Sequence, residues 1–362
     1  MKKTGILIWA CVTHFLVDCI CALVITHQLP GTRNWDLLLL AYNFLAFAGQ
    51  LPLGVLLDLI CKKSGKWGYL PAALLGCILC AGALISGLSP WLLVLTSGLG
   101  NALFHLGSGA DILIDSRGKS RESGLFVSTG AAGIFCGALM DMTEGVRIAA
   151  ACAILFSILL LLSFLISAKN HSEEYTEVVL KNQMENTSVQ GTADWQAESR
   201  HILIPSFCLF LVVLLRSFEG MIFSFPWNEG IRAGVLLTCG IVLGKITGGF
   251  AADRFGSLRT SVVSLGCAAV FLAFSHIPIM GFLGVLLFNM TMPITLTGLF
   301  RRFPGNPGLS FGLLTFALYL GYLPEYAGMA ENLSRPAVYV FLTLLSLGLM
   351  AVSEKGEKSN GG

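Results

Sequence analysis

Long apolar runs separated by short polar stretches recur along the whole chain. Each run is about twenty residues long, the length that an α-helix needs to cross the hydrocarbon core of a bilayer. The pattern predicts an all-α polytopic membrane protein with twelve transmembrane helices. They are expected roughly at 5–27, 35–60, 68–87, 90–112, 121–144, 146–168, 201–224, 229–252, 259–276, 279–300, 307–326 and 335–353.

One long polar segment interrupts this pattern near the middle of the chain. Residues 169–200 carry many charges and few large apolar side chains, which is typical of a linker between domains. We therefore expect a six-helix bundle at 1–168, a cytoplasmic linker at 169–200, a second six-helix bundle at 201–353 and a polar cytoplasmic tail at 354–362. A short surface helix around Glu174–Met184 fits within the linker.

The composition excludes an ordinary soluble domain. Hydrophobic residues make up 55% of the chain and charged residues 12%, and the mean hydropathy is +0.76. The start of the chain resembles a signal peptide, but His14 and Asp18 interrupt its apolar run and no small-residue cleavage site follows. We expect this segment to be retained as the first helix.

The basic residues are distributed unequally between the two sides of the twelve-span arrangement. One side holds only Arg33, Arg147, Arg232 and Arg335. The other side holds Lys2, Lys3, Lys62, Lys63, Lys66, Arg117, Lys119, Arg121, Lys169, Lys181, Arg200, Arg254, Arg259, Arg301, Arg302, Lys355 and Lys358. Because positive charge accumulates on the cytoplasmic side, both termini are predicted to be cytoplasmic, in a multi-pass protein of the cytoplasmic (inner) membrane.

The cysteines are scattered singly, and the pair Cys77 and Cys80 lies within an apolar run without a second pair or nearby histidines. We interpret them as packing residues and expect neither a metal site nor a cofactor.

A short motif occurs once in each half of the chain. Gly54-x-x-x-Asp58 ends the second apolar run, and Gly249-x-x-x-Asp253 ends the eighth, where Arg254 follows directly. The two aspartates are 195 positions apart, and each leads into a basic turn. The repeat indicates a duplicated bundle, in which the first span corresponds to the seventh and Gln50 corresponds to Lys245.

Six spans, a linker and six further spans with this repeated motif resemble the major facilitator superfamily. Within it, Gly98-Leu99-Gly100-Asn101-Ala102-Leu103-Phe104-His105 is similar to the fourth-helix signature of the fosmidomycin-resistance-type branch of drug and metabolite proton antiporters. The stretch Gly124–Gly133 is similar to the fifth helix of that branch, whereas Leu106-Gly107 replaces its usual Pro-Glu. The resemblance implies two pseudo-symmetric bundles with a substrate site between them near the middle of the bilayer.

The resemblance also implies a role for the repeated motif. Asp58 and Asp253 are expected to be hydrated and charged, each facing the cytoplasmic start of a helix in the opposite half, where free N–H groups favour an anion. Ser120 and Asn306 are expected to cap those two helices, with Pro307 in the first turn of the second. Gly54, Asp58, Gly249, Asp253 and Arg254 would then close the cytoplasmic side. An interface without a gating role is the alternative.

Charged and polar residues inside the spans are the candidate functional residues, because burying a charge in hydrocarbon is costly. By the resemblance, the first, fourth, seventh and tenth spans line a central cavity. The residues predicted to bind substrate or protons there, with the second and eighth spans at its edge, are His14, Asp18, Gln50, Asn101, His105, Arg216, Glu219, Lys245 and Asn289.

Structural roles remain open for several of them. Arg216 and Glu219 are three residues apart and compatible with an ion pair along one helix. His14 is compatible with a hydrogen bond to a backbone carbonyl, and Asn101 and Asn289 with hydrogen bonds between helices. Lys245 has no opposite charge three or four residues away, so it requires a partner from another helix or an anionic ligand.

The leading hypothesis is a secondary active transporter that moves a small organic solute by proton-coupled alternating access, most simply as efflux. Asp18 or Glu219 would carry the proton together with His14 or His105, and Arg216 and Lys245 would suit an anionic or zwitterionic solute. Uptake or exchange of an anionic metabolite and a non-transporting membrane sensor are the alternatives. The chain lacks the motifs of intramembrane enzymes, and we expect no enzymatic activity.

The expected partners are a small-molecule substrate, protons and the lipid bilayer, with no nucleic acid, and the protein is expected to be a monomer. Substrate identity, the direction of transport and the coupling ion are not specified by the sequence.

Overall fold

The computed structural model describes residues 3–64, 69–85, 87–168, 195–329 and 333–355, which are helical apart from short connections. The first half contains α1 (Lys3–Gln28), α2 (Trp35–Asn43), η1 (Phe44–Ala48), α3 (Gln50–Ser64), α4 (Leu70–Gly82), α5 (Pro90–Asp115), α6 (Ser120–Leu139) and α7 (Glu144–Ala168). The second half contains α9 (Trp195–Ile222), α10 (Gly230–Phe255), α11 (Ser257–Ala273), α12 (Pro278–Asn289), α13 (Thr291–Arg302), α14 (Pro307–Tyr326) and α16 (Pro336–Lys355).

The described helices confirm the predicted fold class, an all-α polytopic membrane protein. Nine described helical segments are long and apolar enough to cross a membrane, and α4 and α11 are shorter apolar helices. The remaining span is α5, 26 residues long, in which glycines, Asn101 and His105 reduce the apolar character. Together they account for the twelve predicted spans.

The predicted linker lies mostly outside the described residues, as do the short helix predicted at 174–184 and most of the predicted tail. Its end is the exception, because α9 begins at Trp195, within the stretch assigned to the linker.

Two spans that the apolar pattern predicts as single helices are interrupted near their middle. In the second span, η1 is a π-helical turn in which the Gly49 amide donates to the Phe44 carbonyl (2.8 Å). The Gln50 side chain donates to the Ala46 carbonyl of the same turn (2.5 Å). Pro52 lies four residues after Ala48 and has no N–H to donate to the Ala48 carbonyl.

The tenth span is divided into α12 and α13 at Met290. Pro293 has no N–H to offer the Asn289 carbonyl four residues earlier, and its ring crowds that carbonyl. Proline therefore accounts for both interruptions.

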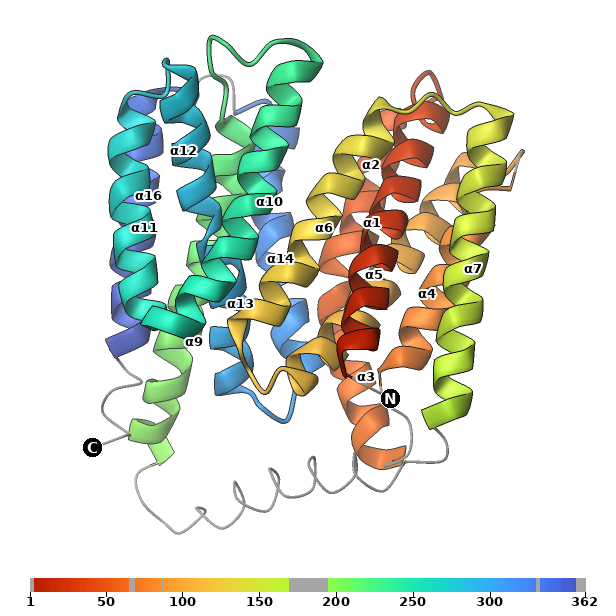
Figure 1. The fold of residues 1–362 in the computed structure, drawn as a ribbon, viewed down its shortest axis with the longest axis horizontal. Coiled ribbons are helices and arrows are strands. Elements are labelled where there is room, and N and C mark those ends of the chain that lie inside the picture. Colours follow the sequence, from red (N-terminus) through yellow and green to blue (C-terminus); the bar gives the residue numbers. More distant parts are fainter. Residues whose placement is uncertain (1–2, 65–68, 86, 169–194, 330–332, 356–362) are drawn as a thin grey trace.

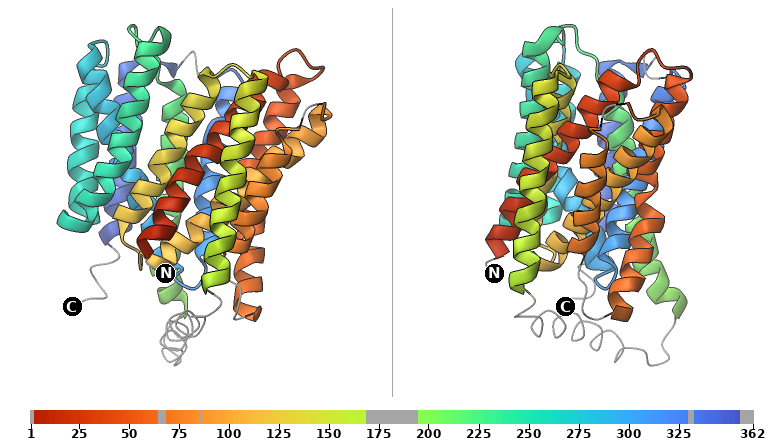
Figure 2. Two further views of the ribbon diagram at one scale, coloured as in Figure 1. Left: turned by 45° about the vertical axis from the view of Figure 1, so that its right-hand side comes forward. Right: turned by 90° about the vertical axis from the view of Figure 1, so that its right-hand side faces the viewer.

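The two halves stand side by side, and both chain ends lie at one end of the bundle, hereafter the terminal end (Figure 1). Contacts between the halves follow two seams, α6 against α10 and α3 against α14 (Figure 2). Gly124 lies against the Lys245 carbonyl in one seam, and Gly54 lies against the Gly308 carbonyl in the other. These glycines allow backbones of opposite halves to touch, as small residues do in membrane helix packing.

Candidate functional site

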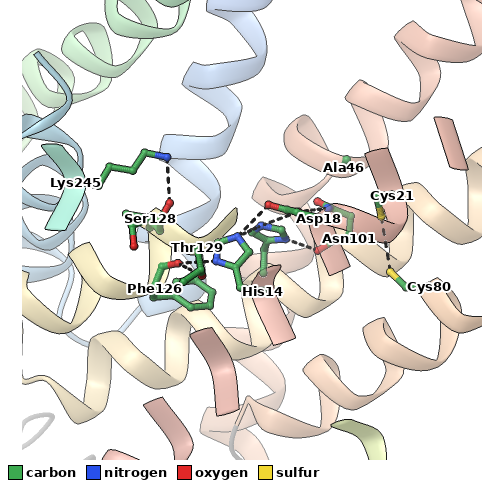
Figure 3. A network of polar contacts seen from close by, with 12 residues as sticks. His14, Asp18, Cys21, Ala46, Cys80, Asn101, Phe126, Ser128, Thr129 and Lys245 are labelled. Carbon is green, nitrogen blue, oxygen red and sulfur yellow. Dashed lines mark hydrogen bonds and ion pairs between the residues drawn. The ribbon is translucent and has the colours of Figure 1, made fainter. Parts of the chain in front are cut away.

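A buried cluster of His14, Asp18 and His105 joins α1 to α5 in the first half. His14 and Asp18 are one helical turn apart on α1, and their side chains converge, with His14 Nε2 3.2 Å from Asp18 Oδ2. From α5, His105 Nε2 lies 2.8 Å from His14 Nε2 and 3.6 Å from Asp18 Oδ1. Asn101, one turn before His105, donates from Nδ2 to Asp18 Oδ1 (2.9 Å). Figure 3 shows His14, Asp18 and Asn101 meeting in this cluster.

Backbone carbonyls orient the two imidazoles. His14 Nδ1 lies 2.7 Å from the Phe126 carbonyl, and His105 Nδ1 lies 2.8 Å from the Asn101 carbonyl. A carbonyl oxygen only accepts, so both Nδ1 atoms are the donors in these contacts. The two Nε2 atoms face each other and the Asp18 carboxylate, so a proton bound there lies between two imidazoles and a carboxylate.

Gly130 of α6 provides the space for this cluster. A Cβ atom at this position would overlap His14 Nε2 and Asp18 Oδ2. The neighbouring turn of α6 also supplies the Phe126 carbonyl that fixes the His14 ring. Three helices, α1, α5 and α6, thus build the site. Gly130 was not among the predicted site residues, although it lies in the stretch that resembles the fifth helix of transporters.

In the second half, Arg216 and Glu219 of α9 are both buried, at 6% and 0% exposure, but no ion pair joins them. Glu219 Oε1 accepts from the Thr343 hydroxyl of α16 (2.7 Å), and its Oε2 has no partner among the described residues. Arg216 Nη2 contacts the Met292 sulphur of α13, and Nη1 has no partner there either. The structural ion pair that the spacing allowed is therefore not formed.

Lys245 of α10 reaches across to the first half, where its Nζ donates to the Val127 carbonyl of α6 (3.0 Å) (Figure 3). The Val127 carbonyl is the partner from another helix that we expected for Lys245. This carbonyl immediately follows the one that holds His14.

The remaining predicted site residues make local contacts. Asn289 donates to the Val285 carbonyl of its own helix (2.9 Å), so the hydrogen bond between helices considered for it is not formed. Gln50 closes the π-helical turn, and its Oε1 is buried without a partner.

Asp58 lies at the start of a helix from the opposite half, as predicted. Its carboxylate accepts from the amides of Gly308 (2.9 Å) and Leu309 (2.8 Å) in the first turn of α14. The Tyr69 hydroxyl donates to the same carboxylate (2.7 Å), a partner that the sequence did not indicate. Asp58 is only 2% exposed, so the expectation of a hydrated position is wrong here. We call this group of contacts the first latch.

Asp253 makes the corresponding contacts in the other seam. It accepts from the amides of Ser120 (2.8 Å) and Arg121 (3.0 Å) at the start of α6. In contrast to Asp58, Asp253 is solvent-exposed. Gly249, one turn earlier, lies against the Ser120 carbonyl and allows the close approach. We call this group the second latch. Arg254 points elsewhere, over the Phe255 ring.

The predicted capping residues do not cap. Lys119, not Ser120, is the N-cap of α6, and the Ser120 hydroxyl pairs with Thr297 (2.8 Å). Asn306 occupies the N-cap position of α14 but makes no capping hydrogen bond, and its side chain accepts from Lys62 Nζ instead (2.7 Å). In both helices a carboxylate from the opposite half occupies the amides that a local cap would take.

Comparison with known proteins gives a likeness of fold. No protein-family model and no curated protein matches the chain. Among solved structures, the human organic anion transporter MFSD10 (TETRAN) matches with a TM-score of 0.63 and 12% identity, covering 97% of this chain and 100% of that one. The proton:xylose symporter XylE matches with a TM-score of 0.58 and 15% identity over 97% and 95% of the two chains.

The E. coli fucose:proton symporter FucP matches with a TM-score of 0.55 and 13% identity over 96% of this chain and 98% of its own. The chain therefore has the fold of the major facilitator superfamily, as a multi-pass membrane protein of two six-helix halves.

Proposed function

We propose that this protein is a proton-coupled secondary transporter that moves a small organic solute by alternating access, with efflux as its direction. The observation that carries the proposal is the His14–Asp18–His105 cluster, in which two imidazoles and a carboxylate from two helices converge in the first half. A proton held between side chains of two different helices is released when those helices separate or when the solute changes the surrounding charge.

The two latches supply the second requirement of alternating access, a closure that can break. Each consists of hydrogen bonds from one carboxylate to two amides of the other half, and both lie at the terminal end. The distribution of basic residues favours the cytoplasm for this end. Breaking the latches would open the site to that side. Two of the structural neighbours, FucP and XylE, are proton symporters, which supports the coupling to protons.

The experiment is proton movement in proteoliposomes loaded with a pH-sensitive dye. Benzoate, benzenesulfonate, phenyltrimethylammonium, fucose and xylose would be added outside in turn. We expect at least one solute to move protons with the wild type, and Asp18→Asn to reduce the rate by at least about tenfold, because a proton bound in the cluster loses its counter-charge. Asp36→Asn, at an exposed position of α2, is the matched control and should leave the rate unchanged.

Two outcomes would contradict the proposal. One is solute movement with undiminished proton flux in Asp18→Asn. The other is solute movement in the wild type that no imposed pH gradient accelerates or slows.

A further inference from the structure

Arg216, which is buried, and Lys245, which is half-buried, are cations without an ion-pair partner among the described residues. Among the described residues, no carboxylate lies within ion-pair distance of either side chain. Glu219, three residues after Arg216, pairs with Thr343 instead. A buried charge without a counter-charge is costly, so a protein retains one only where something compensates for it.

The contacts that Arg216 does make leave most of its hydrogen-bonding capacity free. Nη1 is buried and has no acceptor. Nη2 meets only the Met292 thioether, which is a weak acceptor. Met292 lies next to Pro293, just after the interruption between α12 and α13. The guanidinium therefore lies against a bend in the tenth span.

The hydrogen bond of Lys245 can be replaced by a hydrogen bond to another acceptor. An ammonium group has three donors, and only one of them is engaged, by the Val127 carbonyl across the seam between the halves. Gly244, beside Lys245, packs against the Leu286 carbonyl and Asn289, which brings this part of α10 to the same bend in the tenth span.

We infer that Arg216 and Lys245 bind the oxyanion group of the transported solute, which is a small organic anion bearing a carboxylate, sulfonate or phosphate. The inference rests on the proposed function and assigns its substrate class. A bound oxyanion would satisfy the free guanidinium donors, which suit planar and tetrahedral oxyanions alike. It would also draw Lys245 away from the Val127 carbonyl and so remove one contact between the halves.

The division of charge between the halves supports this assignment. In the first half, Asp18 lies against His14 and His105 of its own cluster. In the second half, neither cation forms an ion pair among the described residues, and Glu219 accepts from Thr343. The proton site and the anion site are thus in different halves, connected by the neighbouring carbonyls of Phe126 and Val127.

The test measures melting temperature in detergent, without a pH gradient. The variants Arg216→Met and Lys245→Met each retain an unbranched side chain and remove one charge. We expect Arg216→Met, and to a smaller extent Lys245→Met, to melt above the wild type when no anion is present, because a charge without an ion-pair partner is removed from the buried site of Arg216 and from the half-buried site of Lys245. Arg232→Met, at an exposed position near the start of α10, is the control and should not change the melting temperature.

Benzoate, benzenesulfonate and phenyl phosphate are the probes, and phenyltrimethylammonium is the matched cation with the same ring. We expect at least one of the three anions to raise the melting temperature of the wild type, and the double variant R216M/K245M to lose that shift. The inference is overturned if both single variants melt below the wild type, or if no anion protects the wild type. It is also overturned if the anions protect the double variant equally, or if only the cation protects.

These results are separable from the test of proton coupling. Anion binding that persists while Asp18→Asn leaves proton flux unchanged would refute the coupling alone. Proton flux coupled to a solute that does not require Arg216 or Lys245 would refute the anion site alone.

Discussion

At the scale of single residues, the arrangement of the His14–Asp18–His105 cluster depends on Gly130, because this residue has no side chain. The imidazole of His14 and the carboxylate of Asp18 both occupy the space that a Cβ atom of residue 130 would take. The same turn of α6 fixes the His14 ring through the Phe126 carbonyl. Space and orientation for the cluster therefore come from α6, a helix that contributes no titratable group to it.

Replacement of Gly130 tests this dependence. Gly130→Ala should displace His14 or Asp18, lower the free energy of unfolding by about 1–3 kcal/mol, as overpacking typically does, and reduce proton-coupled transport. Gly5→Ala is the control on α1, because a Cβ atom there meets nothing within 4 Å. Thermal melting and the proteoliposome assay measure both effects. Wild-type transport by Gly130→Ala would show that the cluster is not needed in this arrangement.

At the scale of helices, the sequence predicted the spans well and their internal structure poorly. Pro52 and Pro293 are visible in the sequence, but apolar runs of this length were interpreted as continuous helices. Proline is tolerated inside a membrane helix when the surrounding structure accommodates the lost hydrogen bond, as the π-helical turn before Pro52 does. Hydropathy does not contain that information.

Patterns along a single segment of the chain predicted some parts of the site, whereas contacts between distant segments were not predicted. The spacing of His14 and Asp18 placed them on one face of a helix, and the repeated motif predicted where both aspartates would lie. The capping roles of Ser120 and Asn306 were wrong because a residue from the opposite half occupies the amides. The pairing of α1 with α5 through His105, and the contribution of Tyr69 to the first latch, depend on packing between segments distant in sequence.

The two latches offer a prediction about helix contacts. Asp58→Asn should destabilise the protein more than Asp253→Asn, because Asp58 is buried and accepts from two amides and a hydroxyl, whereas Asp253 is exposed. The expected loss for Asp58→Asn is about 1–3 kcal/mol, the cost of leaving buried hydrogen-bonding groups unsatisfied. Thermal melting of both variants measures the difference. Equal losses would indicate that burial does not distinguish the latches.

At the scale of the whole molecule, two seams close the terminal end, one through the buried Asp58 and the other through the exposed Asp253. Besides the first latch, the α3–α14 seam carries the exposed contact of Lys62 with Asn306. That contact joins side chains of opposite halves at the surface, which makes it a position where the closure can be fixed chemically.

Cross-linking there should stop the transport cycle. In the double variant Lys62→Cys/Asn306→Cys, a short bifunctional thiol reagent should reduce transport by at least about tenfold, because the halves can no longer separate at this end. The single variants treated with the same reagent control for modification of the native cysteines. Reducing the link should restore transport. Unchanged transport by a fully cross-linked protein would mean that this seam does not part.

The unequal burial of the two aspartates has a consequence for the order of events. Water already reaches Asp253, so its hydrogen bonds can be replaced one at a time as the second latch loosens. The hydrogen bonds of the first latch must break without water to replace them, and the Tyr69 hydroxyl stabilises the Asp58 carboxylate further. We therefore expect the α6–α10 seam to part first and the α3–α14 seam to part after it. A solute leaving at the terminal end would then follow an off-axis route, on the side of the molecule where Lys245 has just been released.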